Sequence, residues 1–184
     1  MVYGFIIMTD NYSERSLDSI ASEVRDKIHY LIEKGFSPSL IVNWIKESIH
    51  PKGLIITKDY RIILTDSGKE VVMRPLEKTL YLFFLKRESG CRFKELPQYK
   101  DELLRIYNRI TTFDNMAENR SRISRLADPL NKSFLEKCSV IRRAFLAEMP
   151  SLEAELYCIS GNRGECKKIV LDRTLVIWET EPLQ

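Results

Sequence analysis

The spacing of the apolar residues changes at Gly53, and this change divides the chain into two parts. Before Gly53, apolar residues from Leu17 to Leu31 recur every three or four positions, which is the period of an amphipathic helix. After Gly53, short β-branched runs alternate with turn residues, which is the pattern of strands. We therefore predict a helical hairpin over residues 1–53 and a separate α+β domain over residues 54–184.

The hairpin has a clear turn between its two helices. Gly35 ends the first helix, and Ser37 followed by Pro38 is typical of an N-cap and first helical position. The second helix then presents one apolar face as far as His50. That face must be buried against the rest of the chain or a second copy. Residues 15–50 are thus expected to be a docking element or the interface of a homodimer.

The second part begins with a predicted small antiparallel sheet and continues with helices. Pro75 begins a helix with an apolar face, and polar turns separate the strands before it. The structure of residues 111–130, which are polar and basic, stays undecided between a helix and a loop. The predicted strands cover residues 54–56, 60–64 and 71–73, and the first two predicted helices cover residues 75–86 and 99–110.

A third helix is predicted at about residues 131–147. It has one narrow apolar stripe, which consists of Phe134, Cys138, Ile141 and Phe145. The opposite face is polar and consists of Lys132, Glu136, Ser139 and Arg143. A hairpin at about residues 155–171 is predicted to follow this helix, and residues 175–178 complete the domain as a last strand.

The turn Gly161-Asn162-Arg163-Gly164 admits three interpretations: a glycine loop that binds phosphate, a metal site, or a plain hairpin. A phosphate loop leads into a helix N-terminus, whereas this turn joins two predicted strands. The same letters in a KH domain need helices on both sides. Cys158 and Cys166 flank the turn, but no CxxC pair or nearby histidine supplies further zinc ligands. A hairpin with Arg163 at its tip is the best interpretation.

The order strands, helix, helix, helix, hairpin is that of a winged helix-turn-helix. "VMRPLEKTLYLFFL", "NKSFLEKCSVIRRAF" and "YCISGNRGECKKIVL" resemble, in turn, the first helix, recognition helix and wing of the effector domain of OmpR-type response regulators. The resemblance covers about residues 54–172. Cys166 and Lys167 stand where that family has Gly and Tyr, and about twenty residues separate the second and third helices. The first 53 residues cannot form a receiver domain, so aspartyl phosphorylation is not implied.

The resemblance implies a DNA-binding protein, namely a transcriptional regulator whose third helix enters the major groove of double-stranded DNA. Local charge supports an anionic partner: residues 120–147 hold seven Lys and Arg against two Asp and Glu, while the whole chain is only +3. A solvated helix face is the alternative explanation of that charge. The expected DNA contacts are Lys132, Ser139, Arg142, Arg143, Arg163, Lys167 and Lys168.

A protein-interaction module built on the same scaffold is the second hypothesis. Glu136 and Glu165 would repel phosphates, and they lie within the proposed DNA-binding surface. A mixed-sign surface with Leu135 and Val140 exposed would favour a protein partner.

The chain shows no motif of an enzyme or of a cofactor site. GxSxG, HExxH, GxxxxGK[ST] and GxGxxG are all absent, and the two histidines suit structural or surface positions. We therefore expect no catalytic residues, no metal and no cofactor. No stretch of eighteen apolar residues could span a membrane, and the start lacks the features of a signal peptide. Four cysteines without pairing motifs suit free thiols in a reducing cytosol, so a cytoplasmic location is expected.

Overall fold

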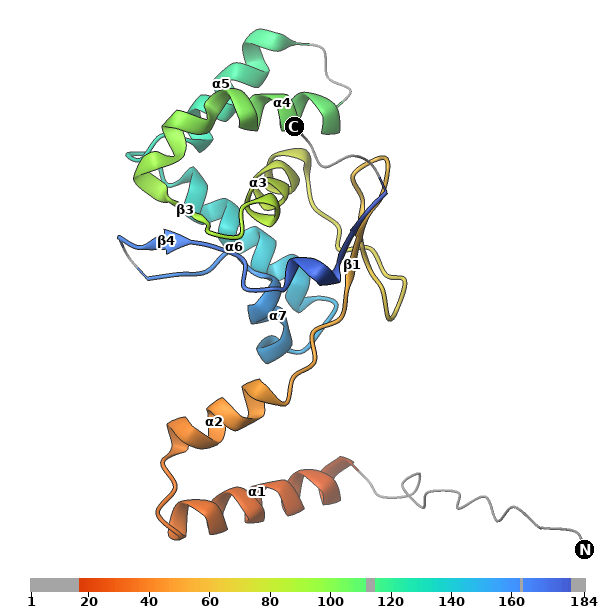
Figure 1. Cartoon of the computed structure of the whole chain (residues 1–184), viewed down its shortest axis with the longest axis vertical. Helices are drawn as coiled ribbons and strands as arrows, with labels where there is room; N and C mark the ends of the chain where they lie inside the picture. Colours follow the sequence, from red (N-terminus) through yellow and green to blue (C-terminus); the bar gives the residue numbers. More distant parts are fainter. Residues whose placement is uncertain (1–16, 112–114, 163, 180–184) are drawn as a thin grey trace, which may run out of the picture. The chain divides into compact units, whose positions relative to one another are not determined.

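The computed structural model describes residues 17–111, 115–162 and 164–179, and it divides the chain into two units (Figure 1). The first unit ends at Ile49 and the second begins at His50, three residues before the change of pattern at Gly53. Among the described residues, no helix is long and apolar enough to cross a membrane.

The first unit contains the predicted helical hairpin. Helix α1 spans Leu17–Glu33 and helix α2 spans Pro38–Glu47. Gly35 takes a positive φ of 91° at the turn, a conformation that favours glycine. Ser37 caps α2, because its side chain accepts a hydrogen bond from the Leu40 N–H at 3.3 Å. Both signals predicted from the sequence are confirmed.

The second unit has an α+β fold with a small mixed sheet. Strand β1 (Leu54–Ile56) pairs antiparallel with β2 (Ile62–Leu64) and parallel with β5 (Val176–Trp178), in the order β2-β1-β5. Alternate residues of β1 and β2 are buried, because successive side chains of a strand point to opposite faces of the sheet. The last strand is thus confirmed, and it adds a parallel neighbour to β1.

The expectation of a purely antiparallel sheet with a third strand at residues 71–73 was wrong. After β2, the chain forms one bridge between Glu70 and Ile63, and the Val71 N–H donates to the Ile62 carbonyl at 2.8 Å. The chain then leaves β2, because helix α3 (Pro75–Lys86) begins four residues later. The free edge of β1 is filled by β5 from the other end of the unit.

Helix α3 lies at the centre of the second unit. Residues Leu80 to Leu85 are all buried, so this helix is covered on every side for about one and a half turns. It packs against α4 (Lys100–Ile110) and α6 (Ser133–Leu146). The sequence alone leaves the structure of segment 111–130 undecided. Within it, residues Met116–Leu126 form helix α5, which packs against α4. A 3-10 helix, η1 (Phe93–Tyr99), leads into α4.

The predicted hairpin at 155–171 needs a correction at its first arm. Residues Ser151–Tyr157 form a helix, α7, with Ala154 and Tyr157 buried on one side. Leu, Glu and Ala favour a helix here, and the two buried residues three positions apart fit a helical face better than a strand. The Tyr157 hydroxyl also holds the end of this helix by donating to the Lys52 carbonyl at 2.8 Å. The hairpin therefore begins after α7, where Ser160 bridges Lys168.

The second arm of this hairpin belongs to a two-stranded sheet. Strand β4 (Cys166–Lys167) pairs antiparallel with β3 (Cys91–Arg92), which lies between α3 and η1. Gly90 permits this pairing, because a Cβ there would lie 2.2 Å from the Lys167 carbonyl oxygen. A last 3-10 helix, η2 (Arg173–Leu175), leads into β5.

Candidate nucleic-acid interface

Local side-chain hydrogen bonds define the start of α5 and the short turn that joins it to α6. At the start, Asn115 caps α5 by accepting from the Glu118 N–H at 3.1 Å. In the turn, the Asp128 side chain accepts from the Leu130 N–H, and the Asn131 side chain accepts from the Ser133 N–H, both at 2.9 Å. These side chains end one helix and start the next within six residues.

The predicted inner stripe of α6 is confirmed. Phe134, Ile141 and Phe145 are fully buried, and Cys138 is half-buried. Desolvation raises the pKa of the Cys138 thiol to about 12, which keeps it neutral in the core. This burial fixes the rotation of α6 and so decides which residues face solvent.

The outward surface of α6 is mixed in sign and partly apolar. The Ser139 hydroxyl donates to the Leu135 carbonyl of its own helix at 3.0 Å, and Leu135 is 55% exposed. Arg142 lies 4.0 Å from Glu155 on α7, which is a long contact for an ion pair. Arg143 has no ion-pair partner among the described residues. The exposed residues are Lys132, Leu135, Glu136, Ser139, Arg142, Arg143 and Leu146.

Three of the seven basic residues in segment 120–147 are paired with carboxylates. Lys137 lies 2.9 Å from Glu77, a carboxylate that is only 2% exposed at the start of α3. Arg122 binds Glu118 and also donates to the Tyr107 hydroxyl at 3.1 Å. Arg142, described above, is the third. The four that form no ion pair within the described parts of the chain are Arg120, Arg125, Lys132 and Arg143, and all four are exposed.

The hairpin contributes fewer free cations than the sequence suggested. The Lys167 amino group donates to the carbonyls of Gly161 and Asn162, the latter at 3.1 Å. These hydrogen bonds hold the Lys167 amino group against the turn, so it is less available to a phosphate. Lys168 is exposed, and Arg163 lies outside the described residues.

A groove of about 670 Å³ lies between the start of α6 and this hairpin. Its apolar lining includes Phe93 and Phe134, whose rings stack with centroids 4.5 Å apart. Leu135 from α6 and Gly164 from the hairpin line the same groove, so these two predicted contact regions are neighbours in space. Its charged lining residues are Arg92, Lys94, Glu165 and Lys167.

Several exposed cations were not singled out from the sequence. Arg120 and Arg125 belong to the basic segment and are exposed on α5, but no contacts were assigned to them. Arg92 and Lys94 reach the groove only through the pairing of β3 with β4, and no local pattern reveals that pairing.

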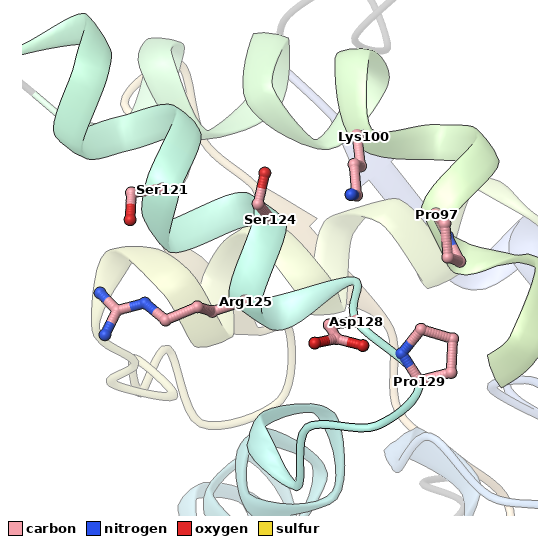
Figure 2. Close-up of a pocket in the computed structure, with 7 residues that line it drawn as sticks. All are labelled: Pro97, Lys100, Ser121, Ser124, Arg125, Asp128 and Pro129. Atoms are coloured by element: carbon pink, nitrogen blue, oxygen red, sulfur yellow. The ribbon is translucent and has the colours of Figure 1, made fainter.

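A second, polar pocket of about 320 Å³ lies between α4 and α5. Figure 2 shows Lys100 and Ser124 on the two helices that border it, with Asp128 at its lower edge. A Ser and a Lys together suggest a nucleophile and its base, but such a pair needs a direct hydrogen bond. The described residues show no such bond between Ser124 and Lys100, nor any cluster of three metal-ligating side chains.

Comparison with known proteins gives no match: no protein-family model, no curated protein and no solved structure is significantly similar to this chain.

Proposed function

We propose that residues 50–184 form a winged-helix domain that binds double-stranded DNA, and that the protein is a transcriptional regulator. Helix α6 serves as the recognition helix and the hairpin at residues 158–168 as the wing. The observation that carries the proposal is the shared groove: Leu135 on α6 and Gly164 on the hairpin line the same hollow. A recognition helix and a wing must lie side by side in this way to contact one duplex.

The pairing of the hairpin with strand β3, which lies next to the helices, supports the same proposal. Its second arm, β4, is bound to β3, which follows the central helix α3. The hairpin is therefore anchored beside the helices, as a wing must be if it is to add contacts to a fixed helix. The effector domain that the sequence resembles has three helices before its wing, which correspond here to α3, α4 and α6. Helices α5 and α7 are additional elements.

Charge supports DNA as the ligand of this unit. Residues 50–184 hold 24 Lys and Arg against 19 Asp and Glu, whereas residues 1–49 hold five against seven. The cations available for phosphates are Arg120, Arg125, Lys132 and Lys168. Ser139 and Arg143 are the proposed base-reading residues, since Arg can donate two hydrogen bonds to guanine.

The test is fluorescence anisotropy with a random-sequence duplex, repeated from low to physiological salt. We expect micromolar binding that weakens steeply with salt, because each phosphate contact releases counterions. The double variant Lys132→Ala, Lys168→Ala, which removes one exposed cation from the start of α6 and one from the hairpin, should lower the salt slope by about 2. Arg105→Ala, which removes an exposed cation on α4, is the matched control. Equal slopes for the double variant and the control would refute the assignment of α6 and the wing.

A protein-interaction module is the second candidate, and two observations favour it. The outward surface of α6 is mixed in sign, and Leu135 is exposed on it. The groove beside it is lined by partly exposed Phe93, which stacks on buried Phe134, and this surface suits an apolar side chain of a partner. If this candidate is correct, duplex binding is absent even at low salt. A partner captured by the wild type would then be lost in Leu135→Asp but retained in Val72→Asp, a control at a residue that is 75% exposed.

A further inference from the structure

The helical hairpin of the first unit has one strongly apolar side and one charged side. On α1, Ile20, Val24 and Ile28 recur at intervals of four, so they share one face. One charged pair borders this face and the other lies opposite it: Lys27 contacts Glu23 at 2.8 Å at its edge, and His29 contacts Glu33 at 3.4 Å on the far side. Such exposed pairs at i, i+4 are typical of the solvent side of a helix.

Helix α2 is apolar over a wider arc than α1. Leu40, Ile41, Trp44 and Ile45 follow the helical period. The Trp44 ring contacts Phe36 in the turn, with centroids 5.3 Å apart. Polar residues of α2, such as Asn43, occupy the remaining narrow face.

The hairpin does not cover this apolar surface by itself. Ile41 is its one buried side chain among the described residues, and Ile28, Leu31 and Ile49 are partly buried. The remaining large apolar side chains of the described hairpin keep about two fifths or more of their surface. Summed over the apolar face, this leaves on the order of 700 Å² per chain, close to the ~800 Å² that each partner of a standard interface buries. At about 25 cal/mol per Å², so large an exposed area would be strongly unfavourable in water. Tyr30 lies on the charged side of α1, with the Lys34 amino group over its ring. The exposed members of the apolar face are Ile20, Val24, Ile32, Phe36, Leu40, Val42, Trp44 and Ile45.

The character of the charged side argues against a membrane and a duplex as the surface that covers this face, and cover by the rest of the chain would leave the wild type monomeric. A helix that lies on a membrane carries an excess of Lys and Arg on its polar face. Here α1 carries Arg25 and Lys27 against Asp18, Glu23, Asp26 and Glu33, so an anionic lipid surface is a poor fit. A duplex is a poor fit for the same reason, since residues 1–49 are net acidic.

We propose that the apolar face of this hairpin binds the same face of a second copy, which makes the protein a homodimer. A two-helix layer with one apolar side is complementary to itself, and two such layers stack into a four-helix bundle. The balanced i, i+4 pairs remain on the outside of that bundle. This inference is independent of the proposed DNA binding, because it rests on the first unit alone.

The experiment measures the mass of the full chain by light scattering after size exclusion, at protein concentrations from about 1 to 100 μM. The wild type is expected to be a dimer. Ile45→Lys and Val24→Lys place a charge on the apolar face and should shift the chain to a monomer. Asn43→Lys and Ser22→Lys add the same charge two residues away on the polar face and should remain dimeric.

A second measurement separates a lost interface from a lost fold and from other partners. Two differently tagged wild-type copies should co-purify when co-expressed, and the tagged Ile45→Lys copies should not. Read in a Trp44→Phe background, the fluorescence of Trp178 in the second unit should be unchanged in every variant, because that unit has its own core. A wild type that is monomeric at 100 μM, or a dimer that survives both Ile45→Lys and Val24→Lys, would overturn the proposal.

Discussion

The buried ion pair between Glu77 and Lys137 offers the sharpest test of how the second unit is held together. It joins the first turn of α3 to the middle of α6, residues that are 60 positions apart in sequence. Glu77 is 2% exposed, and its second carboxylate oxygen has no hydrogen-bond partner among the described residues. Lys137 is therefore the group that compensates this buried charge, and we predict that Lys137→Met is strongly destabilising.

The magnitude follows from the burial of the carboxylate. Removing one partner of a buried pair costs about 3–5 kcal/mol, and the 23% exposure of the Lys137 side chain favours the lower end. For a unit of this size, about 3 kcal/mol corresponds to a fall in Tm of roughly 10 °C. The double variant Glu77→Leu, Lys137→Met removes both charges together and should recover most of the loss.

The assay is urea and thermal unfolding followed by tryptophan fluorescence. A Trp44→Phe background removes the tryptophan of the hairpin, so that Trp178 on β5 reports the second unit alone. A loss below about 1 kcal/mol for Lys137→Met would mean that water reaches Glu77 and that the pair acts as a surface contact. A double variant as unstable as the single one would show that packing at position 137, and not charge, carries the effect.

Three further predictions rest on single contacts. Gly90→Ala should destabilise the second unit by more than Gly68→Ala. Both glycines have φ near +70°, which costs an alanine about 1 kcal/mol, but only at Gly90 would the added Cβ clash with a carbonyl oxygen, that of Lys167. Equal losses of stability in urea unfolding would argue against the β3–β4 pairing. Cys166 is exposed and should react first with a thiol reagent at pH 8, whereas burial raises the pKa of the Cys138 thiol to about 12. Duplex DNA should slow the labelling of Cys166. If Cys166 is labelled at the same rate with bound DNA as without it, the DNA lies away from the hairpin. The Thr174 N–H and hydroxyl each donate to the Asp172 carboxylate at 2.8 Å, and these hydrogen bonds lower the pKa of Asp172. The contribution of Asp172 to stability is therefore present above about pH 4 and is lost as pH falls. Asp172→Ala should flatten the acid side of the stability profile, and an unchanged profile would contradict this.

The elements that the sequence predicted well are those with local signals. The N-cap at Ser37, the start of α3 at Pro75 and the buried stripe of α6 depend on neighbouring residues within a turn or two. Residues 155–157 were misassigned because three residues cannot distinguish a strand from the last turn of a helix. The pairing of β5 with β1 joins residues more than 120 positions apart, and nothing local records it.

The candidate site was only partly predictable, because charge counted along the chain ignores partners from elsewhere. Segment 120–147 holds seven cations and two acids, yet Glu77, Glu118 and Glu155 lie outside it and pair with three of those cations. The count from the sequence therefore overstates the positive charge that the segment presents to a duplex.

This difference can be measured with two matched changes on α5. Arg125 has no ion-pair partner among the described residues, whereas Arg122 is bound to Glu118. Each cation that meets a phosphate contributes about 0.9 to the slope of log binding constant against log salt. Arg125→Gln should therefore lower that slope by about 0.9. The double variant Glu118→Gln, Arg122→Gln removes the paired charges without changing net charge, so it should leave the slope unaltered. If the double variant lowers the slope as much as Arg125→Gln, the pair must open on DNA, and the charge counted along the sequence would be the correct guide after all.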